Sequence, residues 1–107
     1  MKIYNLYWEG HLFAHEVTME EAVRIKNKNP GFRFEIEDAI SDEMARNFWK
    51  DAMGTIWGEP DRSYSTRSIP TRDFAEIMKM DYDRILPYLY KCTTLGLTDR
   101  QGGGWVI

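Results

Sequence analysis

The spacing of hydrophobic residues changes along this chain, and the first part shows the two-residue period of β-strands. Two runs, KIYNLYW and HLFAHEV, flank Glu9-Gly10, a two-residue turn in which the glycine can supply a positive φ. The turn predicts a hairpin in which Leu6 lies opposite Phe13, and opposed residues share one face of a sheet. The apolar face predicted in this way consists of Tyr4, Leu6, Trp8, Phe13 and Val17.

A helical pattern follows the hairpin, and alternation then returns. Thr18 and Glu21 have the spacing of a capping box, which predicts a helix from Thr18 to about Asn29. Residues 32–37 alternate between apolar and charged side chains, so they predict a half-buried strand. A right-handed crossover would place this strand beside the first one and antiparallel to it. Residues 1–38 therefore predict a ββαβ unit.

The second part of the chain begins with a helix that Ser41 can cap. A wide apolar stripe runs along it at helical spacing. The stripe consists of Met44, Ala45, Phe48, Trp49, Ala52, Met53, Ile56 and Trp57. We interpret it as a core face, and a groove or a dimer seam is the alternative. The polar run of residues 62–69 follows and can form a short strand.

Residues 71–107 organise the rest of the chain: they predict a short helix, a tight turn, a second helix and a small hairpin. Thr71 can cap the first helix and Asp81 the second, which runs to about Thr94. Gly96 suits the left-handed position just beyond a helix end. Two strand-like runs, residues 97–99 and 105–107, then flank a glycine-rich loop.

This order of helix, turn, helix, "LGL" and hairpin resembles the winged helix-turn-helix domain. Residues 86–107, LPYLYKCTTLGLTDRQGGGWVI, resemble the end of its recognition helix followed by the wing. The resemblance covers residues 41–107 and implies a C-terminal winged helix. The only candidate linker, residues 38–41, is short, so we expect an α+β protein in which the ββαβ mini-domain packs on that winged helix. The resemblance also implies a non-enzymatic regulator of transcription that binds duplex DNA. We expect such a regulator to be a homodimer, because one winged helix reads few base pairs.

Composition limits the other functions. The chain has 107 residues, 43% of them hydrophobic, which suits one compact domain, or one with a small appendage. Its net charge of −3 is unusual for a nucleic-acid-binding protein. No run is long and apolar enough to span a membrane, and a single cysteine excludes an internal disulfide, so we expect a cytoplasmic protein without a membrane partner.

The residues that could carry chemistry form no catalytic pattern. His11 and His15 lie four positions apart on a strand, about 13 Å, which is too far for one metal ion. Cys92 falls on the apolar side of its helix, where a buried, inert thiol is expected. The acidic residues are scattered. The sequence therefore predicts no enzyme, no metal site and no cofactor.

Binding remains, through the outward face of the second helix and the wing. The outward positions include Asp83 and Pro87, and proline in a helix predicts a kink or a later helix start. Acidic Asp83 disfavours DNA at the end of the helix that usually approaches bases. The predicted DNA- or partner-binding residues are Arg84, Tyr88, Lys91, Thr94, Arg100, Gln101, Arg72 and Arg67.

A protein-binding module is the alternative function. Small acidic proteins that join a mini-domain to a winged helix resemble phage accessory proteins in size, charge and domain arrangement, without a shared motif. Some of these, such as anti-CRISPR inhibitors, occupy a nucleic-acid-binding protein. The same surface would then bind a basic protein partner in place of DNA.

Overall fold

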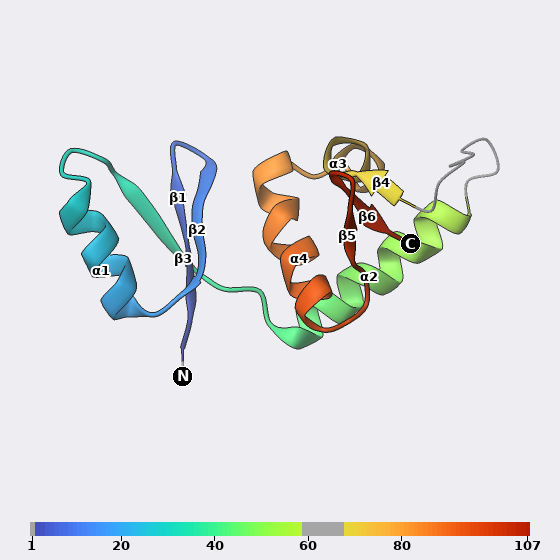
Figure 1. Ribbon diagram of the computed structural model, residues 1–107, viewed down its shortest axis with the longest axis horizontal. Coiled ribbons are helices and arrows are strands. Elements are labelled where there is room, and N and C mark those ends of the chain that lie inside the picture. Colours follow the sequence, from blue (N-terminus) through green and yellow to red (C-terminus); the bar gives the residue numbers. More distant parts are fainter. Residues whose placement is uncertain (1, 59–67) are drawn as a thin grey trace. The chain divides into compact units, whose positions relative to one another are not determined.

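The computed structural model describes residues 2–58 and 68–107, and this part of the chain confirms the α+β class. It contains four helices and two three-stranded antiparallel sheets (Figure 1). The chain divides into two compact units, residues 1–39 and residues 40–107. Each unit contains one of the two sheets and its own hydrophobic cluster.

The first unit has the element order predicted from the sequence. Its elements are β1 (Tyr4–Trp8), β2 (His11–Val17), α1 (Met19–Lys28) and β3 (Phe34–Asp38). The strand order is β2-β1-β3, with β3 antiparallel to β1 as expected. The capping box is also confirmed: the Glu21 backbone N–H donates to the Thr18 hydroxyl at 3.2 Å, and the Thr18 N–H donates to the Glu21 carboxylate at 3.2 Å.

The predicted hairpin register is correct only next to the turn. Trp8 pairs with His11, but Leu6 pairs with Ala14, not Phe13, because β2 contains irregularities that insert extra residues. At one of them Glu16 has a φ of 55°, and its N–H donates to the Asn5 side-chain oxygen at 3.0 Å. The apolar face therefore differs from the prediction: Leu6 and Val17 are buried, whereas Phe13 is exposed.

The second unit contains the remaining elements. They are α2 (Asp42–Trp57), β4 (Ser68–Pro70), α3 (Thr71–Met78), α4 (Tyr82–Thr94), β5 (Arg100–Gln101) and β6 (Gly104–Val106). The strand order is β4-β6-β5, so β4 pairs with the last strand of the chain. Residues 62–67 of the polar run predicted to form a strand lie outside the described residues.

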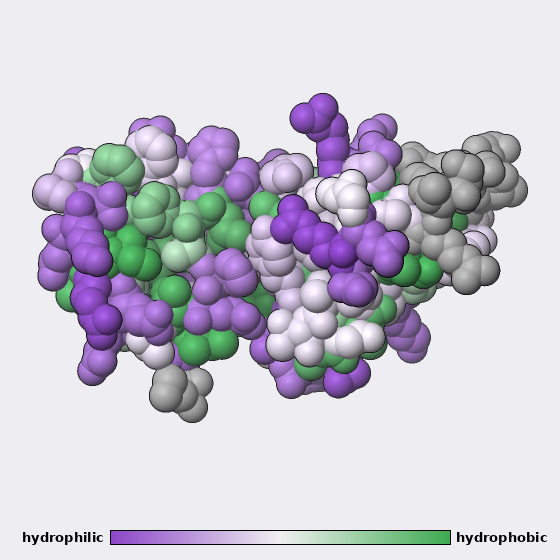
Figure 2. Space-filling model, in the orientation of Figure 1, coloured by the Kyte–Doolittle hydropathy of each residue, from purple (hydrophilic) through white to green (hydrophobic). Residues whose placement is uncertain are grey.

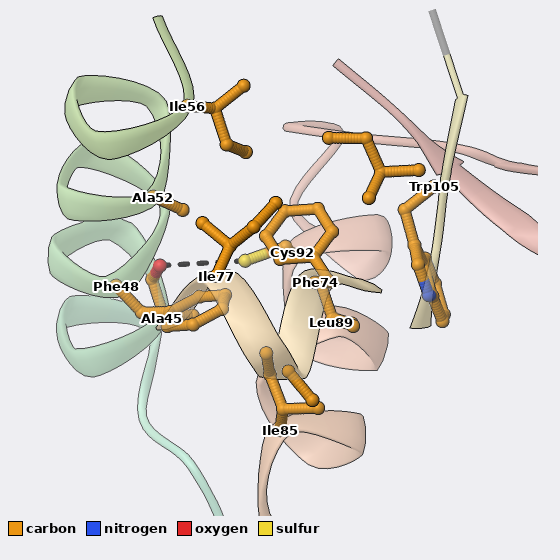
Figure 3. Packing of buried hydrophobic residues seen from close by; sticks show 12 residues of the cluster. Ala45, Phe48, Ala52, Ile56, Phe74, Ile77, Ile85, Leu89, Cys92 and Trp105 are labelled. Carbon is orange, nitrogen blue, oxygen red and sulfur yellow. Dashed lines mark hydrogen bonds between the residues drawn. The ribbon is translucent and has the colours of Figure 1, made fainter. Parts of the chain in front are cut away.

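The core of the second unit lies between α2, α3 and α4, with β6 closing one side (Figure 3). Ala45, Phe48, Ala52 and Ile56 extend from α2 toward α3 and α4, as the stripe predicted. The ends of the stripe do not belong to this core, because Met44 and Trp57 are 46% and 69% exposed. The Ser41 hydroxyl caps α2 by accepting the Met44 N–H at 3.1 Å.

The predicted cap of α3 is wrong, and tertiary structure gives the reason. Pro70 occupies the N-cap position because β4 continues to it, and Thr71 is the first helical residue. The buried Thr71 hydroxyl instead accepts the indole N–H of Trp105 at 2.8 Å. This hydrogen bond joins the beginning of α3 to β6.

The boundaries of α3 and α4 agree only in part with the predictions. Lys79, with φ 54°, ends α3, and Asp81 precedes α4, although its side chain makes no capping hydrogen bond. The helix starts at Tyr82 and includes Pro87, so the later start considered from the sequence is wrong. Pro87 is also buried, not outward as predicted. Gly96, with φ 77°, follows α4 as expected.

The terminal hairpin is tighter than predicted and shifted along the chain. Its strands are β5 and β6, so the expected strand at residues 97–99 is absent from this described region. Gly102 and Gly103 form its tip with φ values of 55° and 81°, the pair of positive values that a tight two-residue hairpin turn requires.

Candidate nucleic-acid interface

A hollow of about 410 Å³ lies where the starts of α3 and α4 meet the hairpin tip. Its lining consists of Pro70, Thr71, Arg72, Asp73, Tyr82 and Gly103. The Thr71–Trp105 hydrogen bond holds β6 against the start of α3 beside this hollow. Tyr82, the first residue of α4, is 49% exposed, so its ring is available at the rim.

The electrostatics of this hollow combine both signs of charge. Neither α3 nor α4 has a side-chain capping hydrogen bond, so both helix starts present backbone N–H groups with the positive end of the helix dipole. Arg72 is exposed and adds a full positive charge. The carboxylates of Asp73 and Asp81 oppose this positive charge. An anion in the hollow is therefore attracted by the backbone N–H groups and Arg72 and repelled by the two carboxylates.

The hairpin beside the hollow carries two of the sequence-predicted residues. Arg100 is exposed, and its guanidinium lies over the Trp105 ring at 5.3 Å from the centroid. Gln101 is exposed as well, and its backbone carbonyl oxygen accepts a hydrogen bond from the Ser68 hydroxyl at 3.1 Å. Stacking on a buried ring limits the movement of Arg100, so its charge is held in a defined place on the hairpin.

The residues predicted on α4 do not form one surface with the hairpin. The Tyr88 ring packs on Phe48 with the centroids 4.9 Å apart, and Lys91 forms an ion pair with Asp42 at 3.1 Å. The Lys91 side chain is only 15% exposed, so its charge is largely neutralised. Thr94 is exposed near the end of α4, where its hydroxyl donates to the Tyr90 carbonyl oxygen at 3.1 Å.

Arg84 is half-buried on α4. Arg67 lies outside the described residues. Of the predicted set, Arg72, Arg100 and Gln101 therefore lie on the part of the unit around the hollow and the hairpin. Tyr82 was not among the predicted residues, although it lines the hollow; its apolar ring at the start of a helix gives no sequence signal for binding.

A second hollow, of about 350 Å³, lies between α2, the end of α3 and α4. Its lining is rich in methionine and aromatic residues: Met44, Asn47, Phe48, Asp51, Met78, Met80 and Tyr88. Methionine side chains are flexible and polarizable, so they adapt to apolar partners of different shape. Tyr88 thus belongs to an apolar hollow and not to a DNA-facing row with Arg84.

Metal binding and the single thiol can be examined within residues 2–58 and 68–107. No three histidine, cysteine or acidic side chains there could hold a metal ion together. Cys92 is fully buried, its Sγ lies 3.5 Å from the Ala45 carbonyl oxygen, and burial raises the pKa of its thiol from 9.0 to about 11. A thiol in that environment stays protonated and is a poor nucleophile.

The helices of the described residues are all too short or too polar to cross a bilayer. Comparisons with known proteins give no relative: no family model, no curated protein and no solved structure matches this chain.

Proposed function

We propose that residues 40–107 are a winged helix-turn-helix that binds duplex DNA through the start of α3, the start of α4 and the β5–β6 hairpin. The element order α2-β4-α3-α4-β5-β6 and the strand order β4-β6-β5 support this proposal. The single observation that carries it is the hollow in which two helix starts, exposed Arg72 and the glycine tip of the hairpin meet.

A DNA phosphate suits this hollow for physical reasons. Backbone N–H groups at a helix start donate hydrogen bonds to phosphate oxygens, and the helix dipole favours negative charge there. Arg72 can add a charge-assisted hydrogen bond, and Arg100 can reach the neighbouring backbone from the hairpin. Asp73, Asp81 and Asp83 weaken attraction to any DNA, so binding depends on a good fit more than on net charge.

Fluorescence anisotropy with labelled duplex DNA at several salt concentrations tests the proposal. Arg72→Gln and Arg100→Gln should each weaken binding several-fold and lower the salt slope by about 0.9 for each phosphate that is no longer neutralised. Arg46→Gln is the matched control, since Arg46 is exposed on α2, away from the hollow lining. Asp83→Asn should tighten binding to duplexes of all sequences.

Two results would end the DNA proposal. The first is no binding of the parent protein at tens of micromolar in about 50 mM salt, where phosphate contacts are strongest. The second is an equal loss of affinity in Arg46→Gln and Arg72→Gln, which would indicate an effect of total charge only.

The methionine-lined hollow favours a second candidate function, the binding of a protein such as a nucleic-acid-binding protein. Exposed Met44 and half-buried Met80 could receive an apolar side chain of the partner, with Asp51 at the rim facing a basic residue. A photoreactive residue at position 44 should then crosslink to the partner, and Met80→Glu should abolish the crosslink. The same photoreactive residue at exposed position 50 should give none.

A further inference from the structure

The first unit concentrates its positive charge in one short segment. Residues 24–33, RIKNKNPGFR, contain four of the five basic residues of the unit and no acidic residue. Arg24, Lys26, Lys28 and Arg33 are all exposed. Within the described residues none of the four forms an ion pair. The segment therefore keeps its charge available, although the chain as a whole is acidic.

An exposed cluster of aromatic rings lies at the same end of the unit. Trp8 and Phe32 stack with their centroids 4.6 Å apart and their planes 16° apart. The Phe13 ring meets Phe34 edge-on at 4.9 Å. Phe32 and Phe13 keep 40% and 44% of their surface exposed. The hydrophobic cluster of this unit buries Leu6, Val17 and Ala22, so these two rings extend beyond the buried core.

The fold places the end of α1, with Lys26 and Lys28, and the aromatic rings at the same end of the unit. The helix α1 runs from the end of β2 toward the end of the sheet that carries the Glu9–Gly10 turn (Figure 1). The chain then turns at residues 29–31, where the Phe32 N–H donates to the Asn29 carbonyl oxygen at 3.2 Å. Figure 2 shows exposed apolar side chains of this unit beside strongly hydrophilic ones.

We propose that this surface, formed by residues 24–33 with Trp8 and Phe13, binds single-stranded nucleic acid. A single strand offers both phosphates for the cations and unpaired bases for the rings, and base stacking on aromatic side chains tolerates any sequence. A duplex hides the faces of its bases, so it could use the cations but not the rings. An acidic peptide would likewise need only the cations. The combination of charge and exposed rings therefore selects a single strand.

Anisotropy of a labelled oligothymidylate of about 12 nucleotides, a length within the usual site sizes, measures this binding on the full chain. The parent protein should bind with a salt slope of about −2 to −3, since each phosphate neutralised on a single strand contributes about −0.7. Phe32→Leu keeps an apolar side chain but removes the ring, and it should weaken binding roughly tenfold. Lys26→Gln with Lys28→Gln should weaken it and reduce the slope.

Arg46→Gln with Lys50→Gln is the matched control, since it removes two exposed cations from α2 in the other unit. Circular dichroism of each variant verifies that it is folded. The proposal is overturned if the parent does not bind at tens of micromolar in about 50 mM salt. It is also overturned if the control variant loses as much affinity as the Lys26 and Lys28 variant.

Competition with polyglutamate distinguishes a single-stranded nucleic acid from an acidic protein as the partner. Equal binding of polyglutamate and oligothymidylate, both unaffected by Phe32→Leu, would assign the surface to acidic proteins and reject the nucleic-acid proposal. The test is independent of duplex binding by the second unit, because Arg72→Gln should leave oligothymidylate binding unchanged.

Discussion

The hydrogen bond between Thr71 and Trp105 allows a quantitative test of how the second unit is held together. Trp105 is fully buried, and its indole N–H donates to the Thr71 hydroxyl at 2.8 Å. Thr71→Val keeps the branched shape and has a similar helix propensity, but it removes the acceptor. A buried donor left without a partner costs about 1–3 kcal/mol, so we expect the free energy of unfolding to fall by that amount.

Urea denaturation followed by circular dichroism measures this decrease, with an unchanged m value if only stability changes. For a domain of this size each 1 kcal/mol corresponds to about 4–8 °C in the melting temperature. The hollow at the starts of α3 and α4 should widen as well, because the same bond holds β6 against Thr71. Duplex binding should therefore weaken in Thr71→Val even under conditions where the variant is fully folded.

A double-mutant cycle separates the hydrogen bond from changes in packing. Trp105→Phe removes the indole N–H, so in that background Thr71→Val leaves no donor unsatisfied and should be neutral or stabilising. A coupling free energy of about 1–3 kcal/mol is expected between the two changes. If Thr71→Val costs the same in both backgrounds, the hydrogen bond contributes nothing and the reasoning is refuted.

Three further predictions concern single positions. A Cβ on Gly104 would meet the Ser68 hydroxyl and lie 3.0 Å from the Ile69 carbonyl, so Gly104→Ala should cost about 1–3 kcal/mol in urea denaturation. Lys79→Gly should raise stability by up to about 1 kcal/mol by the same measurement, because Lys79 has a left-handed φ of 54° that glycine adopts without strain. Burial raises the pKa of the Cys92 thiol from 9.0 to about 11, so between these pH values the unfolded chain loses the thiol proton while the folded chain keeps it. The stability that the buried, protonated thiol contributes is therefore full below pH 9 and is lost as the pH rises toward 11. Stability should therefore fall over this range by up to about 3 kcal/mol more in the parent than in Cys92→Ala.

Local sequence determined the helices and their ends where the partners are close neighbours in the chain. The capping box of Thr18 and Glu21 and the cap at Ser41 need only residues three positions apart, so they could be predicted. The α2 stripe was predicted for the same reason, since helical periodicity alone places Ala45, Phe48 and Ala52 on one face. Together with the alternating residues 32–37, these local features predicted the α+β class.

Tertiary structure decided the features that depend on distant residues. The β1–β2 register shifted because Glu16 adopts a positive φ and bonds the Asn5 side chain, eleven positions away. Thr71 pairs with Trp105 across 34 positions and so does not cap α3. A sequence pattern can assign a residue to a helix face, but it cannot tell which distant side chain competes for the same polar group.

The candidate site shows the same division between local pattern and tertiary contact. Arg72 and Arg100 were predicted as binding residues from their charge and position, and both are exposed around the α3 start and the hairpin. Tyr88 and Lys91 were predicted from their helical spacing on the outward face of α4. In the structure Tyr88 packs on Phe48, and Lys91 forms an ion pair with Asp42. Sequence alone proposed a set of candidate binding residues, and it missed Tyr82, which lines the hollow. The packing of α2 against α4 decided which of them remain available, because contacts between helices depend on three-dimensional distance and not on periodicity.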